Sequence, residues 1–416
     1  MKKAILILGI LLLTTILVFA GGKKEDTTGK VTLSFWHPYG EGSWSSDYID
    51  SVISDFTTAH PNIAVKSQSF PDYAAIIEAL QRGVAGGQLP SIATIGYGYE
   101  RYILGSGKAH PYNNYLSNNF REDFFEKVLD VTTFNNDVYG VPFALSVPVI
   151  FYHSDVFEKA GLDPDNPPTT WAEFIQVSKI LRDKLGIYGA TFALDDPWAF
   201  ECLLRSRGGE FLSKDNELLI NSPAAKNLLA DWGKGAKDNY FLYNADFFET
   251  LQTFSAKQVG MFVVSSYGTL LYHDTAPEIL VSSIPTGSAS DEVKAAIGGN
   301  ALYLFGNDEK EREAAALFVD FFTGPENNAL WAMNSGYLPT RKSSLEEMGA
   351  FMEGFDNYQK IVSYIGVVDK PTQWPERHVL RINQYLMEAI ESVMIQQSDA
   401  ETSLEEAYRK INPLLK

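Results

Sequence analysis

The chain has 416 residues, of which 45% are hydrophobic and 21% charged. These proportions are typical of a globular protein with a large core and exclude a disordered one, and the length allows two or three domains. The formal net charge of −18 repels the phosphate backbone of nucleic acids and anionic lipid. Nucleic acid is therefore not an expected partner.

The first residues have the pattern of a secretory signal peptide. Lys2 and Lys3 precede an apolar run, and Val18-Phe19-Ala20 supplies small residues before a cleavage point. We expect residues 1–20 to be removed and residues 21–30 to form a mobile leader. An uncleaved membrane anchor is the alternative, although the run is slightly short to span a bilayer. No cysteine directly follows the run, which excludes a lipid-anchored cysteine, so the mature protein is expected to be free outside the inner membrane.

The single cysteine, Cys202, allows no internal disulfide. It lies in the apolar, helical setting AFECLLR, which predicts a buried and unreactive thiol. Stability must therefore come from the core.

The first part of the chain alternates strands and helices. Apolar periodicity predicts strands at 31–36, 63–65 and 91–95, with helices at 48–56 and 73–84 between them. This order implies parallel strands joined by right-handed crossovers, with any ligand at the carboxyl ends of the strands.

The rest of the chain reads as a second body that is richer in helices. A buried strand is predicted at 147–152, followed by a short helix at 156–160 and a helix that Thr170 caps. The last helix is predicted at 379–395. The segments before it are strands 188–194, 259–264 and 301–305, helices 199–206, 224–232, 245–254 and 311–322, and a turn-rich segment at 333–340.

One long stretch carries a specific resemblance. VPFALSVPVIFYHSDVFEKAGLDPDNPPTTWAEF, residues 141–174, closely resembles the cross-over segment of extracellular solute-binding proteins of ABC importers, the carbohydrate and glycerol-3-phosphate group. His153 stands where the family has Asn. The stretches AIGGNALYLF and EAAALFVDFFTGPENNALWAMNSGYLPTRKS are similar to the family as well, so the resemblance runs from about Val31 to the C-terminus.

The resemblance implies an α/β fold of two discontinuous lobes with a ligand cleft between them. The N-terminal lobe would comprise 30–143 plus 298–325, and the C-terminal lobe 144–297 plus 326–416. It also implies a function: a periplasmic, monomeric binding protein would capture a carbohydrate by hinge closure and deliver it to the permease subunits of an ABC importer.

Signatures of enzymes are mostly absent from the sequence. The six histidines are scattered without metal-ligand spacing, no nucleophile turn occurs, and neither glycine-rich stretch has the spacing of a phosphate or dinucleotide loop. No metal, cofactor or catalytic residue is therefore predicted. Asp195 and Asp196 could serve as glycosidase carboxylates, although exposed loop acids are commoner. A glycan-active enzyme and a sensory binding protein remain the alternatives from other classes.

Aromatic residues next to turns and strand ends suit a sugar site. Sugars offer apolar faces to aromatic rings and hydroxyl groups to polar side chains. The aromatic candidates are Trp36, Tyr73, Tyr97, Trp198 and Tyr337.

The resemblance adds positions that contact ligand in glycerol-3-phosphate members. Besides Tyr73 and Tyr337, they match Ser146, Ser266 and Gly299.

Two positions depart from the family pattern. A family glutamate falls at Tyr97, and a family arginine falls at Asn383, with Arg381 two residues away. These departures favour a neutral sugar, with glycerol-3-phosphate or a glycerophosphodiester as the alternative.

Overall fold

The computed structural model describes residues 30–117, 120–244, 247–273, 276–374 and 377–415. The predicted signal peptide, and the predicted leader apart from Lys30, lie outside these residues. None of the helices in the described ranges combines the length and the apolar character that crossing a bilayer requires.

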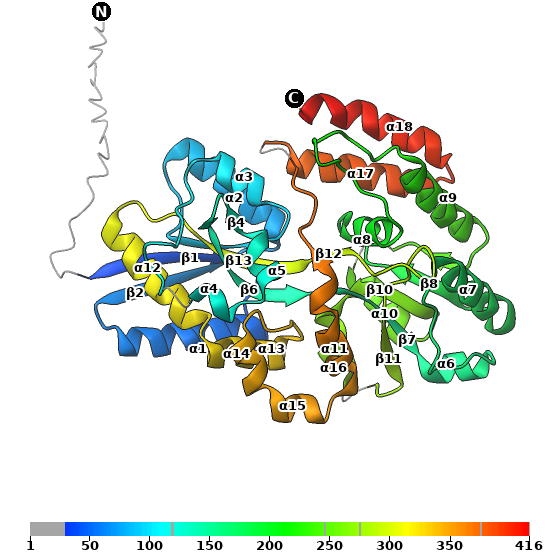
Figure 1. Ribbon diagram of the computed structural model, residues 1–416, viewed down its shortest axis with the longest axis horizontal. Helices are drawn as coiled ribbons and strands as arrows, with labels where there is room; N and C mark the ends of the chain where they lie inside the picture. The colour runs from blue at the N-terminus through cyan, green and yellow to red at the C-terminus, as the bar shows by residue number, and fades with distance from the viewer. Residues whose placement is uncertain (1–29, 118–119, 245–246, 274–275, 375–376, 416) are drawn as a thin grey trace, which may run out of the picture. The chain divides into compact units, whose positions relative to one another are not determined.

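The first sheet has the strand order β2-β1-β3-β13-β6 (Figure 1). β1 pairs in parallel with β2 and with β3, which confirms the predicted strand–helix alternation. β13 enters from far along the chain and pairs antiparallel with both β3 and β6. The strand bounds are β1 Val31–His37, β2 Ile63–Ser69, β3 Ile92–Gly96, β6 Gly140–Ser146 and β13 Gly298–Leu304.

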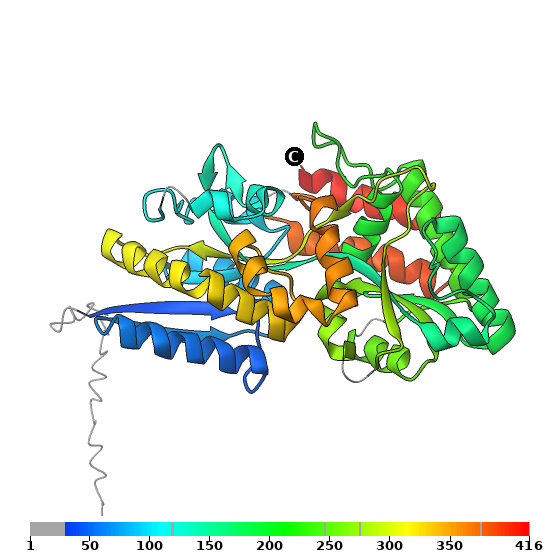
Figure 2. The ribbon, with the colours of Figure 1, turned by 60° about the horizontal axis from the view of Figure 1, so that its bottom comes forward.

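Two capped helices cover opposite faces of this sheet. Ser43 caps α1 (Trp44–Ala59), and Asp72 caps α2 (Tyr73–Gly86). The chain moves from β1 outward to β2 and then back across β1 to β3, so right-handed crossovers place the two helices on opposite sides. The apolar stripes of α1 and α2 accordingly belong to different core clusters. α12 (Glu309–Phe322) packs beside α1 and against β1 (Figure 2).

The second sheet has the order β11-β7-β10-β8-β9. β7 is antiparallel to β10 and to β11, whereas β8 is parallel to β10 and to β9. Every residue of β7 is buried, as its apolar run predicts. The strand bounds are β7 Pro148–His153, β8 Tyr188–Phe192, β9 Phe241–Leu242, β10 Val259–Ser265 and β11 Ile279–Ser283.

Helices surround the second sheet. α7 (Trp171–Leu185) packs on β8 and begins with the predicted capping box of Thr170 and Glu173. α9 (Pro223–Lys237) packs with α17 (Val379–Met394) and α18 (Ala400–Ile411). The other helices around this sheet are α6 Ser154–Lys159, α8 Trp198–Ser206, α10 Phe247–Ser255, α11 Thr269–His273 and α16 Asp356–Ser363.

Within the described ranges the chain passes between the two sheets through three segments. Val147 joins β6 directly to β7, and β12 (Ala295–Ala296) leads into β13. The third segment runs from α13 (Pro325–Ser335), which packs in the core of the first sheet, to α16, which packs on β11 of the second sheet. β14 (Val368–Asp369) follows α16 and pairs in parallel with β12. The remaining elements are α3 Glu100–Gly105, α4 Phe120–Asp123, α5 Glu126–Val131, β4 Thr133–Phe134, β5 Asp137–Val138, α14 Lys342–Glu347, α15 Gly349–Glu353 and the 3-10 turns Ser266–Gly268, Tyr364–Val367 and Asn412–Leu415.

Two sequence predictions need correction. The helix at 379–395 is not the last, because Asp399 caps α18. The segment 333–340 is not all turn, because α13 continues to Ser335. The predicted lobe boundaries stay a prediction, although Trp331 of α13 packs into the core cluster of the first sheet. Cys202 is fully buried, as predicted.

Candidate functional site

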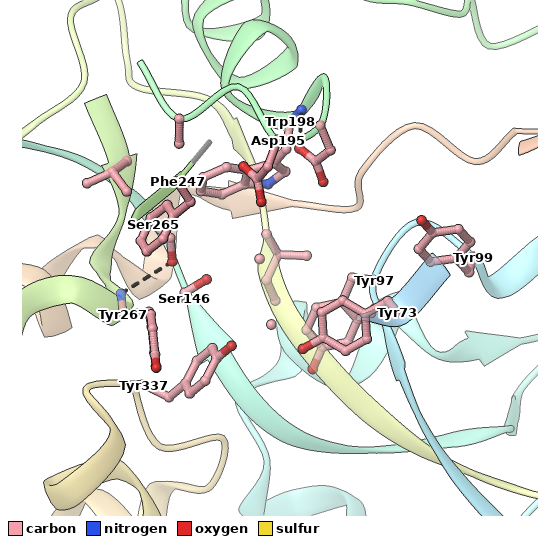
Figure 3. A pocket seen from close by; sticks show the side chains of 17 residues that line it. Tyr73, Tyr97, Tyr99, Ser146, Asp195, Trp198, Phe247, Ser265, Tyr267 and Tyr337 are labelled. Atoms are coloured by element: carbon pink, nitrogen blue, oxygen red, sulfur yellow. Dashed lines mark hydrogen bonds between the residues drawn. The ribbon is translucent and has the colours of Figure 1, made fainter. Parts of the chain in front are cut away.

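A cavity with about 300 Å³ open to water-sized molecules lies where the two sheets approach each other (Figure 3). The ends of β3, β6, β8 and β10 and the start of β13 all reach it. The labelled side chains in Figure 3 surround the open space from both sides. Its lining residues are Tyr73, Gly96, Tyr97, Tyr99, Ser146, Ala193, Asp195, Asp196, Trp198, Phe247, Val264, Ser265, Tyr267, Ile297, Gly298, Gly299 and Tyr337.

Tyr73 is held rigidly on the side of the first sheet. It begins α2 directly after the capping Asp72, and its ring lies against Gly96, where an added Cβ would come within 3.0 Å of the ring. The amide nitrogen of Asn300 donates hydrogen bonds of 2.8 Å to the hydroxyl oxygens of Tyr73 and Tyr39. Burial raises the pKa of Tyr73, so its hydroxyl keeps its proton and can donate to a ligand.

Tyr337 lies in the cavity wall next to Tyr267 and packs against the core of the first sheet. Their ring centroids lie 4.8 Å apart, and buried Trp331 stacks behind Tyr337 at 6.2 Å. The hydroxyl of Tyr358 donates to the backbone carbonyl of Tyr337 at 2.8 Å. These contacts fix the orientation of the Tyr337 ring.

The indole of Trp198 lies next to Gly298, one of the two glycines that begin β13. Its Nε1–H donates to the carbonyl of Ala296 at 3.2 Å, and its backbone N–H donates to Asp196 at 2.8 Å. A Cβ at Gly298 would lie 3.1 Å from the indole and 2.4 Å from the hydroxyl oxygen of Ser146. Glycine at 298 therefore keeps the space between Trp198 and Ser146 open.

The charges that reach the cavity are negative. Asp195 and Asp196 line it, and none of the described lining residues is Lys or Arg. Asp196 is exposed at the edge of the cavity. Partial loss of water around the carboxyl group, together with the neighbouring Asp195 carboxylate, raises the pKa of Asp196.

The structure brings most of the sequence-predicted site residues together. Those that line the cavity are Tyr73, Tyr97, Ser146, Trp198, Gly299 and Tyr337. Asn383 lines a smaller neighbouring cavity of about 50 Å³, which shares Tyr97 and Trp198 with the larger one.

Three predicted residues lie elsewhere. Trp36 packs on Phe70, with ring centroids 5.1 Å apart, and is not part of the lining. Ser266 is fully buried, and its hydroxyl oxygen accepts a 3.1 Å hydrogen bond from the N–H of Val147. Arg381 is exposed on α17 and is absent from both linings.

Several lining residues were not singled out from the sequence. Ser265 and Tyr267 flank the predicted Ser266, Gly298 precedes the predicted Gly299, and Tyr99 follows Tyr97 by two residues. In each case the sequence signal pointed to the right turn. Tyr97 and Gly299 themselves line the cavity beside these neighbours, whereas the predicted Ser266 does not. Phe247 at the start of α10 gave no comparable signal.

Comparison with known proteins supports a shared ancestry for most of the chain. The family profile described as "Bacterial extracellular solute-binding protein" matches residues 51–357. A curated relative, the sn-glycerol-3-phosphate-binding periplasmic protein UgpB of Shigella flexneri serotype 5b, is 27% identical over 336 residues, covering 76% of this chain and 75% of the relative.

Solved structures share the fold across nearly the whole chain. UgpB from Mycobacterium tuberculosis, in complex with glycerophosphocholine, superposes with a TM-score of 0.82 at 20% identity, covering 93% of this chain and 99% of the other. Maltose-bound MalE3 from T. maritima gives a TM-score of 0.79 at 19% identity, covering 92% and 100%. The chain thus has the two-lobed fold of periplasmic binding proteins, and it belongs to the family of bacterial extracellular solute-binding proteins.

Proposed function

We propose that this protein is the periplasmic substrate-binding component of an ABC importer and that its ligand is a neutral carbohydrate. Membership of the solute-binding family supports the transport role. Two of the relatives named above bind glycerophosphocholine and maltose. We therefore consider ligands of about that size.

The composition of the cavity wall is the observation that carries the choice of ligand. Aromatic rings of Tyr73, Tyr97, Trp198 and Tyr337 offer flat apolar faces, and the hydroxyl groups of Ser146 and Ser265 offer hydrogen bonds. The C–H faces of sugars stack on such rings, while their hydroxyls pair with such polar groups. A phosphate would instead meet two carboxylates and no described lining cation, an arrangement that disfavours anions.

Hinge closure is the proposed mechanism. Both sheets contribute walls to the cavity, and within the described residues three segments join them, so a rotation about these segments would close the walls on a ligand. The ligand shifts the equilibrium toward the closed form because only that form contacts it on both sides. The permease would then recognise the closed form.

Glycerol-3-phosphate or a glycerophosphodiester is the second candidate ligand. The names of two UgpB relatives favour it. Its phosphate would need a cation, and Arg381 on α17 is the nearest sequence candidate, which would have to reach the small cavity next to Asn383.

We also propose that the mature protein is a monomer free in the periplasm and that it performs no catalysis. The family and the structural relatives are binding proteins, which supports a binding role for this chain. Release of reducing ends from any bound glycan would contradict the proposal, because it would make Asp195 and Asp196 catalytic candidates.

A thermal-shift screen of the purified protein tests the ligand class. The panel contains neutral mono- and oligosaccharides, polyols, glycerol-3-phosphate and glycerophosphodiesters. A ligand present at about 100 times its Kd adds about 2.7 kcal/mol to the free energy of unfolding, which shifts the melting temperature measurably. We expect at least one neutral sugar to do so. If no carbohydrate shifts the melting temperature, the proposed ligand class is wrong.

Replacing Trp198 by Ala is expected to lower the affinity for that sugar by about 10- to 100-fold, because one stacked aromatic face is lost. Trp36→Ala is the matched control, since Trp36 is also a half-buried indole but packs outside the cavity. Calorimetric titration of both variants gives the affinities, and circular dichroism gives their melting temperatures. Equal affinities in the two variants would remove Trp198 from the binding site.

A further inference from the structure

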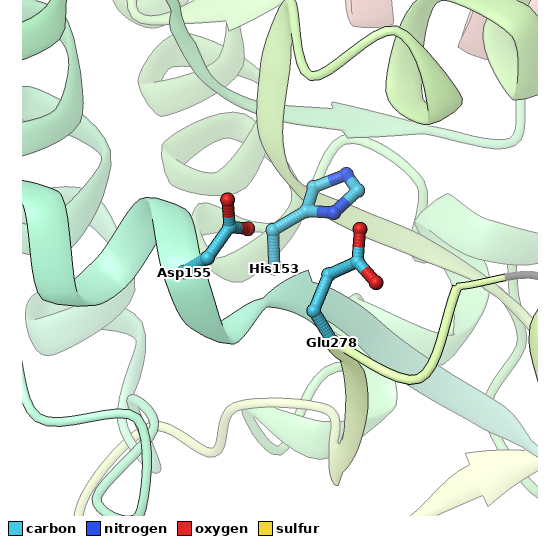
Figure 4. Close-up of side chains that lie close together, drawn as sticks. All are labelled: His153, Asp155 and Glu278. Atoms are coloured by element: carbon cyan, nitrogen blue, oxygen red, sulfur yellow. The ribbon is translucent and has the colours of Figure 1, made fainter.

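Three potential metal-ligating side chains meet at the end of β7 that is far from the cavity (Figure 4). His153 is the last residue of β7, Asp155 lies in the first turn of α6, and Glu278 precedes β11. One nitrogen or oxygen of each lies within 4.8 Å of those of the other two. The opposite end of β7 reaches the cavity, because Pro148 pairs there with Ser265.

The backbone holds these three positions together although Glu278 is distant in sequence. β7 and β11 are antiparallel neighbours in which His153 faces Ile279, so Glu278 comes next to the start of α6. The N–H and the hydroxyl of Ser154 both donate to the carbonyl oxygen of Glu278, at 2.8 and 2.9 Å. The sequence showed no metal-ligand spacing because sheet pairing, rather than a local motif, creates this cluster.

The ring of His153 is oriented so that one of its nitrogens could bind a metal ion. Its Nε2 lies 2.9 Å from the carbonyl oxygen of Phe254, which can only accept, so Nε2 carries the proton and Nδ1 has a free lone pair. Nδ1 has no hydrogen-bond partner among the described residues, and the side chain is 1% exposed. Figure 4 shows the His153 ring directed toward the Glu278 carboxylate, with Asp155 on the other side of the histidine. Metal-binding histidines are commonly fixed in this way by a hydrogen bond from the other ring nitrogen.

A cation already sits between the two carboxylates, and it is the ammonium group of Lys257. Its Nζ lies 3.0 Å from Asp155 Oδ2 and 2.8 Å from Glu278 Oε1. Lys159 also contacts Asp155 Oδ2, at 2.7 Å. Two buried acceptors, Asp155 Oδ1 and His153 Nδ1, have no hydrogen-bond partner among the described residues. Leaving buried acceptors without a partner is costly, and a metal ion bound at the cluster would use them.

We propose that His153, Asp155 and Glu278 form a zinc site in which Lys257 takes the place of the metal when zinc is scarce. One imidazole and two carboxylates are ligands that Zn²⁺ accepts, with water completing a tetrahedron. Bonds of about 2.0–2.1 Å require ligand atoms roughly 3.3 Å apart, so the carboxylates must move inward. Their side chains are 30% and 31% exposed and Lys257 is 35% exposed, so all three are at the surface and have room to rearrange.

Lys257→Met is the informative variant, because it removes the competing ammonium and keeps the length of the side chain. In the full chain without an affinity tag, zinc titrated by calorimetry should bind once per chain. It should bind about 2- to 20-fold tighter to Lys257→Met, since Lys257 makes two competing ion pairs and each costs roughly 1.5- to 5-fold in affinity. Lys159→Met is the matched control, because Lys159 contacts Asp155 alone and should alter zinc affinity less.

Glu278→Gln and His153→Asn should each abolish this binding. Glu278 is partly exposed, so its variant is expected to fold even if the buried histidine variant does not. Zinc binding that survives in Glu278→Gln comes from other surface groups and overturns the proposal. So does the absence of saturable binding in Lys257→Met at millimolar zinc. Because the cluster lies far from the cavity, zinc should leave sugar affinity unchanged in every variant, and this outcome is independent of the proposed ligand class.

Discussion

Glu100→Gln is expected to raise the free energy of unfolding above pH 7 by about 3 kcal/mol. Glu100 is 1% exposed, and burial raises the pKa of its carboxyl group from 4.5 to about 7, although hydrogen bonds from Gln373, Gly98 and Tyr303 oppose the rise. The difference of about 2.5 pKa units corresponds to about 3 kcal/mol at 1.36 kcal/mol per unit.

The sign of the pH dependence follows from proton binding. Between pH 4.5 and about pH 7 the folded chain keeps the proton of Glu100 and the unfolded chain releases it. The contribution of protonated Glu100 to the free energy of unfolding is therefore fully present below pH 4.5, and it is lost as the pH rises through about 7. A glutamine is neutral at every pH, so the variant should match the wild type in acid and exceed it in alkali.

A glutamine at position 100 can keep the hydrogen bonds that Oε2 of Glu100 accepts. Oε2 of Glu100 accepts from the N–H of Gly98 at 2.8 Å and from Nε2 of Gln373 at 2.6 Å, and a glutamine carbonyl can accept both. Its amide would face the hydroxyl of Tyr303, which can accept in turn. Urea denaturation across this pH range measures the effect, with exposed Glu346→Gln as the control. Parallel pH profiles for wild type and Glu100→Gln would show that Glu100 is ionised in the folded chain.

Gly299→Ala should destabilise the fold by on the order of 2–6 kcal/mol, the sum of backbone strain and steric overlap. Gly299 has a φ of 107°, a conformation that side chains rarely adopt. An added Cβ would come within 2.1 Å of the carbonyl oxygen of Ala144 on the paired strand β6. Because that neighbour is backbone, one of the two strands would have to shift at the cavity wall.

Gly349→Ala is the matched control for this variant. Gly349 begins α15, has no positive φ, and an added Cβ would meet nothing within 4 Å. Alanine in a helix costs less conformational entropy than glycine, so this variant should be neutral or slightly more stable. Thermal unfolding of both proteins makes the comparison. Equal melting temperatures would mean that the β13–β6 pairing can absorb a side chain at 299.

Local patterns in the sequence predicted those parts of the fold that depend on neighbouring residues. Apolar periodicity located β1, β3 and β7, and the capping box of Thr170 located the start of α7. α18 was missed because its surface is strongly charged and only a narrow stripe that includes Leu404 and Ile411 is buried. Its capping residue Asp399 was the available signal.

Some site residues could likewise be predicted from the sequence, and others depend on the folded arrangement. Tyr73 and Tyr97 could be expected at the cavity, since the carboxyl ends of parallel strands meet at one edge of a sheet. Which residue between Ser265 and Tyr267 faces the cavity depends on the register of β10 against β7 and on the 3-10 turn that follows. Ser266 turns into the core at this point. Sequence motifs contain neither piece of information.

Calorimetric titration of the purified protein with neutral sugars and with glycerol-3-phosphate, each at low and high salt, tests the central claim most directly. We predict saturable binding of a neutral sugar with an affinity that salt leaves unchanged, because no net charge is neutralised in the complex. We predict no tight binding of glycerol-3-phosphate, since the described cavity wall offers carboxylates without a lysine or arginine. Tight binding of the phosphate that weakens with salt and is lost in Arg381→Ala would contradict the account.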